Sequence, residues 1–181
     1  MARILIVVSS RREGNCFNLG KKIKEELKKE RIVSSIIIPG NQKIYLCTGC
    51  MDCDESGVCD FNDDMSENID KILKSDAVIF ITPTRFNLLS GDLKIFLDRL
   101  NPLTVPQSLK DKKAIIIGIG SSKEEEFSVN GAVTSVDSFC ESNSMNVILK
   151  YAFYDCLEAE DILKQEDKIN TMLEEIKTKL K

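Results

Sequence analysis

Ile4-Leu5-Ile6-Val7-Val8-Ser9-Ser10-Arg11-Arg12-Glu13-Gly14-Asn15-Cys16 opens the chain with five apolar residues that lead into a polar turn. The apolar run is short and β-branched, which is typical of a strand buried on both faces. After the turn, Cys16, Leu19, Ile23 and Leu27 recur at helical spacing, and charged residues fill the positions between them. The stretch therefore predicts a buried strand followed directly by an amphipathic helix.

The same alternation continues to the end of the chain. Four further apolar runs predict strands buried on both faces, at residues 33–38, 77–81, 114–117 and 147–149. Helical periodicity covers residues 65–73, 93–100, 127–140 and 169–180. Strands that alternate with helices form a parallel sheet with helices on both faces. We therefore predict one α/β domain over residues 1–181, with a doubly wound five-stranded parallel sheet in the order 2-1-3-4-5.

Composition excludes several classes of partner. The 181 residues contain 25 Lys and Arg against 29 Asp and Glu, a net charge of −4. Such a chain has no basic surplus for nucleic acid or an anionic membrane, and neither is expected as a partner. No apolar run approaches the ~20 residues that cross a bilayer, and no signal peptide precedes the first strand. We expect a cytoplasmic protein.

Histidine is absent, whereas cysteine occurs seven times. The lack of histidine excludes His-ligated metals and His-dependent catalytic triads. Four cysteines form the pattern C-x2-C-x2-C-x5-C inside residues 39–64, where neither helix nor strand is indicated. A loop of this length within a domain is usually functional. The four cysteines are Cys47, Cys50, Cys53 and Cys59.

The spacing of these thiols favours a [4Fe–4S] cluster, because three cysteines at three-residue intervals suit three corners of one cubane. Two alternatives stay open. In the first, the four cysteines hold no metal and are free thiols or form a redox disulfide. In the second, they bind zinc, although zinc more often takes two separated C-x2-C pairs. At the end of the loop, Asp63-Asp64 is expected to cap the next helix.

Two polar turns follow the first and third predicted strands, which flank the point where strand order reverses in a doubly wound sheet. Ligands bind beyond the carboxyl ends of such strands. In the first turn, the free backbone N–H groups of a helix start suit a terminal phosphate, with Ser10 and Asn15 as side-chain donors. The second turn runs from Thr82 to Gly91, where Thr84, Arg85 and Phe86 offer polar groups and a flat apolar face.

Other residues receive structural interpretations. Cys16, Cys140 and Cys156 are expected to be small buried residues. Asp98 and Arg99 are expected to form surface or interface salt bridges. The segment 93–97 is apolar on more than one helix face, which favours a homodimer or homotetramer.

Three features together resemble the flavodoxin-like NAD(P)H-dependent FMN reductase family, and more closely its iron–sulfur flavoprotein branch. They are the turn Ser9 to Cys16, the cysteine run Cys47 to Cys59 followed by Asp63-Asp64-Met65, and the segment Thr82-Pro83 to Ser90-Gly91 with the helix after it. These features span roughly the first hundred residues.

The resemblance implies FMN, with its phosphate on the first turn and its isoalloxazine ring against the second. It also implies that the cysteines hold a [4Fe–4S] cluster, which exchanges electrons with FMN, commonly across the subunits of an oligomer. On this basis we expect a set of cofactor-binding residues that begins with Ser9, at the start of the first turn. The set is Ser9, Ser10, Arg12, Asn15, Cys16, Phe17, Pro83, Thr84, Arg85, Phe86, Asn87, Gly120 and Ser121.

The function predicted from the sequence is electron transfer by a flavin-dependent oxidoreductase, with NAD(P)H as a donor and a redox protein such as a ferredoxin as a partner. No catalytic acid or base can be named. Two alternatives remain, a non-enzymatic electron carrier or redox sensor, and a cluster-free FMN reductase whose thiols are structural or form a redox switch.

Overall fold

One parallel sheet organises the computed structural model, which describes residues 2–124 and 126–180. Its five strands lie in the order β2-β1-β3-β4-β5, and each strand pairs in parallel with its neighbours. The predicted doubly wound fold is therefore confirmed. The strands are β1 (Arg3–Val8), β2 (Val33–Ile37), β3 (Ala77–Pro83), β4 (Lys113–Ile119) and β5 (Asn146–Phe153).

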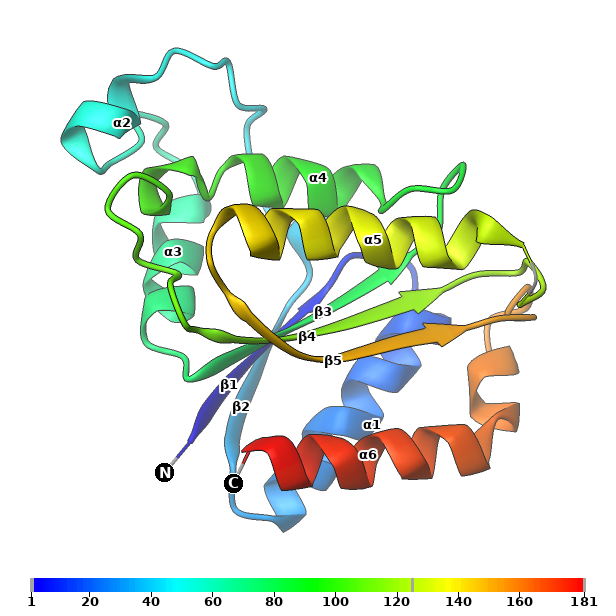
Figure 1. The fold of residues 1–181 in the computed structure, drawn as a ribbon. Helices are drawn as coiled ribbons and strands as arrows, with labels where there is room; N and C mark the ends of the chain where they lie inside the picture. The colour runs from blue at the N-terminus through cyan, green and yellow to red at the C-terminus, as the bar shows by residue number, and fades with distance from the viewer. Residues whose placement is uncertain (1, 125, 181) are drawn as a thin grey trace.

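Helices cover both faces of this sheet (Figure 1). Helices α1 and α6 pack on one face, and α3, α4 and α5 pack on the other. The helices are α1 (Asn15–Lys29), α2 (Asp52–Ser56), α3 (Met65–Leu73), α4 (Gly91–Asp98), α5 (Phe127–Ser142) and α6 (Glu166–Leu180), with short 3₁₀ turns η1 (Pro39–Asn41), η2 (Asn101–Leu103) and η3 (Asp161–Lys164).

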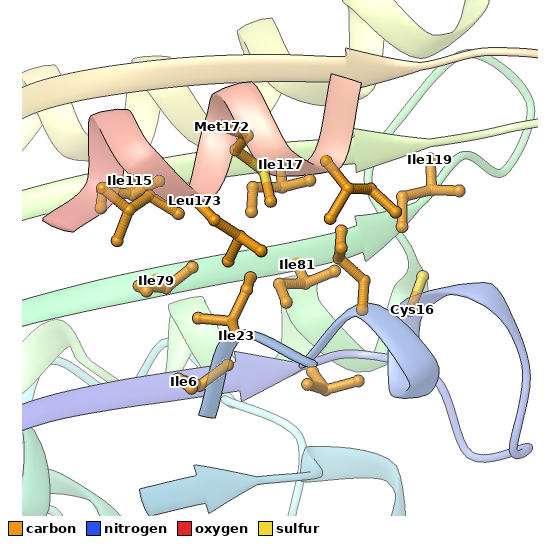
Figure 2. Close-up of a cluster of buried hydrophobic side chains, with 14 of the residues drawn as sticks. Ile6, Cys16, Ile23, Ile79, Ile81, Ile115, Ile117, Ile119, Met172 and Leu173 are labelled. Atoms are coloured by element: carbon orange, nitrogen blue, oxygen red, sulfur yellow. The ribbon is translucent and has the colours of Figure 1, made fainter. Parts of the chain in front are cut away.

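The central strands supply the core because their β-branched side chains point alternately to the two helix layers. Figure 2 shows Ile79, Ile81 and Ile117 facing Ile23 of α1 and Met172 of α6. Each of these side chains is fully buried, and the burial of one such side chain stabilises the fold by about 1.5–3 kcal/mol.

A glycine lets α1 approach the sheet. A Cβ atom at Gly20 would lie 2.7 Å from Val8 Cγ2, which is closer than real Cβ contacts. The absence of a side chain at Gly20 therefore permits α1 to lie against β1. This contact fixes the start of α1 beside the end of the first strand.

We predicted from the sequence that all five strands are buried on both faces. This prediction is wrong for β2 and β5. In β2, exposed residues alternate with partly buried ones, and only Ile37 is buried. In β5, only Phe153 is buried. Both strands lie at the edges of the sheet, where each pairs with a neighbouring strand on one side only.

Helix α4 buries its apolar side chains within the chain itself. Leu93, Phe96 and Leu97 are at most 4% exposed, so the residues that favoured an oligomer pack into the core of the same chain. Ser90 caps the helix, since its hydroxyl accepts a hydrogen bond from the Leu93 N–H at 3.3 Å. No helix among the described residues is both long and apolar enough to span a membrane.

Candidate functional site

The turns after β1, β3 and β4 meet at the carboxyl edge of the sheet and enclose a cavity of about 140 Å³. An adjoining groove of about 540 Å³ shares Ser10, Arg12, Pro83 and Arg85 with the cavity and continues over Ser9 and Ser90. We call the cavity and the groove together the crevice. The cavity is lined by Ser10, Arg12, Asn15, Cys16, Pro83, Thr84, Arg85, Ile119, Gly120, Ser121, Cys156 and Leu157.

The turn between β1 and α1 offers hydrogen-bond donors to this crevice. Gly14 caps α1 without a side-chain hydrogen bond, and the first turn of the helix contains no acidic residue. The N–H groups of that turn have no partner within the helix, and the helix dipole adds a partial positive charge there. The exposed Arg12 side chain lines the same cavity. The turn can therefore bind an anion.

Asn15 has a structural role that the sequence did not reveal. Its Nδ2 donates to the carbonyl oxygens of Cys156 at 3.3 Å and Glu158 at 2.7 Å, and its Oδ1 accepts from the Ile162 N–H at 3.0 Å. These bonds attach the segment after β5 to the start of α1. As a result, Cys156 and Leu157 form a wall of the cavity. Neither was predicted, because nothing in the sequence pairs them with the first turn.

Thr84 presents an unused hydroxyl to the cavity. Its Oγ1 atom is buried and has no hydrogen-bond partner within the described part of the chain. Gly120 adjoins this oxygen, since a Cβ atom there would sit 3.1 Å from it and 2.7 Å from Val129 Cγ2. A buried hydroxyl without a partner costs about 1–3 kcal/mol. A polar ligand group in the cavity would recover that cost.

Phe86 and Asn87 lie at the tip of a tight turn outside the cavity. Arg85 and Leu88 exchange two backbone hydrogen bonds, at 2.9 and 3.0 Å. Both residues between them adopt left-handed backbone conformations, with φ of 48° at Phe86 and 64° at Asn87. This geometry turns the Phe86 side chain into solvent, where it is 99% exposed.

Ser9 and Phe17 also lie outside the cavity. The Ser9 hydroxyl is buried and donates to the Ile81 carbonyl at 3.0 Å, while its own carbonyl accepts from the Ser90 hydroxyl at 3.1 Å. These bonds hold the two polar turns together. Phe17 faces a separate groove beside β2, where Lys21 Nζ lies 5.4 Å from its ring centre.

The two cysteines that line the cavity are neutral thiols. Burial raises the pKa of Cys16 to about 12 and the pKa of Cys156 to about 11. Since the thiolate is the reactive form of cysteine, both thiols are unreactive parts of the wall, and Cys156 Sγ also donates to the Tyr154 carbonyl at 3.2 Å and accepts from Gln165 Nε2 at 3.4 Å. The sequence-based expectation that Cys16, Cys140 and Cys156 are buried is confirmed.

The four-cysteine loop lies at the far end of α4 from the crevice and stands out from the helix layer (Figure 1). α4 begins at the crevice with Gly91 and has eight residues, a rise of ~12 Å. In the loop, Cys53 is buried, Cys59 is partly buried, and Cys47 and Cys50 are exposed. Within residues 2–124 and 126–180, no three potential metal ligands converge on one point.

A buried ion pair fastens the base of this loop. Arg99 Nη1 lies 2.6 Å from Asp63 Oδ2, and both side chains are at most 1% exposed. Arg99 Nη1 also donates to the Tyr45 carbonyl at 2.8 Å. The expected surface salt bridge is therefore wrong for Arg99, because its partner comes from the loop. For Asp98 it is confirmed, since Lys94 pairs with it on the surface of α4.

Of the expected cap Asp63-Asp64, only Asp63 bonds to the start of α3, since the N-cap residue Asp64 makes no side-chain capping bond. Asp63 Oδ1 accepts from the Met65 N–H at 3.1 Å, and Asp63 Oδ2 accepts from the Tyr45 N–H at 2.8 Å. Burial opposes ionisation of this carboxyl, but the bonds from Arg99, Tyr45 and Met65 outweigh it and hold the pKa of Asp63 below its ordinary value.

The donor chemistry of both regions fits the expected groups. The crevice combines an uncapped helix start, a guanidinium and an orphaned buried hydroxyl, which suits part of a phosphorylated ring compound such as FMN. The loop supplies four thiols, the usual ligand set of iron–sulfur clusters, and Gly49 and Gly57 take left-handed conformations within it.

The fold and the crevice define a flavodoxin-like protein, and the comparisons with known proteins name its family. Residues 2–155 match the family model of the NADPH-dependent FMN reductases. The chain belongs to this family.

Curated relatives share the name iron–sulfur flavoprotein, which confirms the resemblance to that branch. One from Methanocaldococcus jannaschii is 30% identical over 64% of this chain and 60% of its own length. One from Archaeoglobus fulgidus is 31% identical over 70% of this chain and 58% of its own length. The matched segment therefore spans about three fifths of these relatives.

Solved structures share the fold at low identity. A flavone reductase matches 95% of this chain and 59% of its own, with a TM-score of 0.74 and 18% identity. An azoreductase from Bacillus anthracis matches 99% of both chains, with a TM-score of 0.72 and 16% identity. At these identities the likeness shows the fold alone.

Proposed function

We propose that the protein is an FMN-dependent oxidoreductase that binds FMN in the crevice and takes electrons from a reduced nicotinamide nucleotide. The observation that carries the proposal is the unpartnered Thr84 hydroxyl, buried in a polar cavity at the switch point of the sheet. The family of the chain supports the same ligand.

The phosphate end is assigned to the turn between β1 and α1. Ser10, Arg12 and the free N–H groups at the start of α1 line the cavity there. A phosphate ester carries close to two negative charges at neutral pH, which the guanidinium and the helix dipole both stabilise. Asn15 acts indirectly, because its amide holds the wall formed by Cys156 and Leu157.

The isoalloxazine ring is assigned to the part of the crevice lined by Pro83, Thr84, Arg85, Gly120 and Ser121. A cavity of about 140 Å³ is smaller than the ~300 Å³ of a small ligand pocket, so the rest of the nucleotide extends into the adjoining groove. The bound flavin supplies hydride acceptance and one-electron transfer, while the protein binds and orients it.

The [4Fe–4S] cluster is part of the same proposal. Cys47, Cys50, Cys53 and Cys59 would hold it, and it would supply one-electron transfer. Because no three potential metal ligands converge among the described residues, cluster binding requires the cysteines of the loop to move closer together.

A homodimer or homotetramer would bring the two proposed cofactor sites together, since α4 separates them within one chain. The exposed side chains of Phe86, Leu88 and Phe127 lie beside the crevice and offer apolar area for such an interface.

A ferredoxin is proposed as the redox partner. A flavin that neither NADH nor NADPH reduces in stopped-flow mixing would identify a carrier instead of an oxidoreductase.

The test of the flavin site compares FMN with riboflavin, which lacks the phosphate. Arg12→Gln should weaken FMN binding about tenfold, or ~1.4 kcal/mol, and leave riboflavin binding unchanged. Arg31→Gln, at the other end of α1, is the matched control and should change neither affinity. Equal losses for FMN and riboflavin in Arg12→Gln would contradict the assignment of the phosphate to this turn.

A further inference from the structure

The junction between α4 and η2 presents an N–H donor to one thiol of the four-cysteine loop. Asn101 Nδ2 donates to Cys53 Sγ at 3.3 Å and to Asp54 Oδ1 at 2.7 Å. Asn101 is the first residue of η2, and two residues separate it from the end of α4. The amide therefore comes from η2, while its acceptors belong to the loop.

Arg99 presents a second donor to the same loop. Its two terminal nitrogens are occupied by Asp63 and by the Tyr45 carbonyl. Its Nε atom is buried and has no hydrogen-bond partner among the residues that the structure describes. The Phe61 ring lies 4.9 Å from the guanidinium carbon, so aromatic contact and ion pairing hold the group in place.

The Arg99 side chain thus fixes the base of the loop, whereas Asn101 is the residue whose donor contacts a cysteine sulfur.

We infer that Asn101 is a positioning residue that holds Cys53 at the α4–η2 junction and raises the reduction potential of an iron–sulfur cluster on the loop. This inference rests on the cluster in the proposed function. Hydrogen bonds to ligand sulfur stabilise the reduced cluster, which carries one more negative charge, and therefore raise its potential.

The test uses Asn101→Leu, which keeps the approximate size of the side chain and removes its donor. The matched control is Asn143→Leu, because Asn143 is also a largely buried amide near η2. It accepts from Thr104 Oγ1 at 2.9 Å and donates to the Phe139 carbonyl at 2.9 Å, and these bonds involve no cysteine. Each protein is reconstituted anaerobically with iron and sulfide, and circular dichroism checks that it is folded.

Wild-type protein should bind about four iron atoms per chain. Asn101→Leu should show a lower cluster potential in an electrochemical titration followed by electron paramagnetic resonance. It should also release iron to a chelator about tenfold faster, as expected when an outer hydrogen bond to a ligand is lost. Asn143→Leu should match the wild type in both measurements.

An unchanged potential and an unchanged rate of iron release in folded Asn101→Leu, with wild-type protein that binds iron, would overturn the inference and leave the cluster intact. Wild-type protein that binds no iron would overturn the cluster and the inference together.

Discussion

Arg99 and Asp63 form an ion pair that is almost completely removed from solvent, although the two residues belong to different parts of the fold. Arg99 Nη1 lies 2.6 Å from Asp63 Oδ2, and Arg99 Nη2 lies 3.1 Å from Asp63 Oδ1. Asp63 ends the four-cysteine loop, and Arg99 ends α4. The pair therefore fixes the base of a projecting loop to the helix layer.

Loss of one partner should be costly. Arg99→Met leaves a buried carboxylate without its counter-charge, and we expect unfolding to become easier by about 3–5 kcal/mol. Asp98→Asn, which breaks the exposed pair with Lys94, should change stability by less than about 1 kcal/mol. Urea unfolding of both variants gives the comparison, and equal effects would contradict the burial of the Arg99 pair.

The same pair predicts a dependence of stability on pH. The pKa of Asp63 is held below its ordinary value in the folded protein. Its stabilising contribution is therefore fully present above the unfolded pKa of about 4 and is lost as the pH falls through the lower, folded value. Urea unfolding between pH 3 and 7 should show a smaller loss for Asp63→Asn than for wild type. Parallel curves would show that Asp63 does not titrate in this way.

Gly120→Ala tests the shape of the crevice. The new Cβ atom would lie 3.1 Å from Thr84 Oγ1 and 2.7 Å from Val129 Cγ2, so it narrows the cavity. We expect FMN affinity to fall about tenfold. Gly118→Ala is the matched control, since its Cβ would lie 2.7 Å from Val133 Cγ2 within the core. It should lower stability by about 1–3 kcal/mol without a selective loss of FMN affinity.

Asn15→Asp should detach the segment after β5. The substitution removes both N–H donors and places a carboxylate against the Cys156 and Glu158 carbonyl oxygens, and we expect a loss of ~2 kcal/mol. Asn18→Asp removes one exposed bond, from Asn18 Nδ2 to the Ala159 carbonyl at 3.2 Å, and should cost less than half as much. Hydrogen exchange should increase in residues 156–165 of Asn15→Asp alone. Unchanged exchange there would show that Asn15 does not anchor the segment.

The thiols should differ in reactivity toward iodoacetamide in metal-free, reduced protein. Cys47 and Cys50 are exposed and should be alkylated first at pH 8. Burial raises the pKa of Cys16 and Cys140 to about 12, so both should stay unmodified until the protein unfolds. Peptide mass spectrometry at increasing times distinguishes the sites. Early alkylation of Cys16 would contradict a closed cavity wall.

The sequence predicted the sheet well because its strands are short β-branched runs that need two covered faces. It failed at β2 and β5, whose apolar runs indicated burial on both faces although the predicted strand order already placed both strands at the edges of the sheet. It also missed α2, a helix of five residues that is too short to show a period. Arg99 was misjudged for another reason. Its partner, Asp63, precedes it by 36 residues, and only the folded chain brings them together.

The candidate site could also be predicted only in part from the sequence. Ser10, Arg12, Thr84 and Arg85 could be predicted because they follow strands that flank the switch point. Cys156 and Leu157 could not, because their place in the cavity depends on hydrogen bonds to Asn15. Phe86 was expected along the flavin ring, but two consecutive left-handed residues turn it toward solvent. This turn has no clear sequence signal, since neither of the two residues is glycine.

The binding of FMN to the purified, flavin-free protein tests the central claim most directly. Equilibrium ultrafiltration with increasing FMN should show saturation at about one FMN per chain, with half-saturation at or below micromolar concentration, ~8 kcal/mol of binding free energy. Protein that retains no FMN at micromolar concentration would contradict the assignment of the crevice as a flavin site.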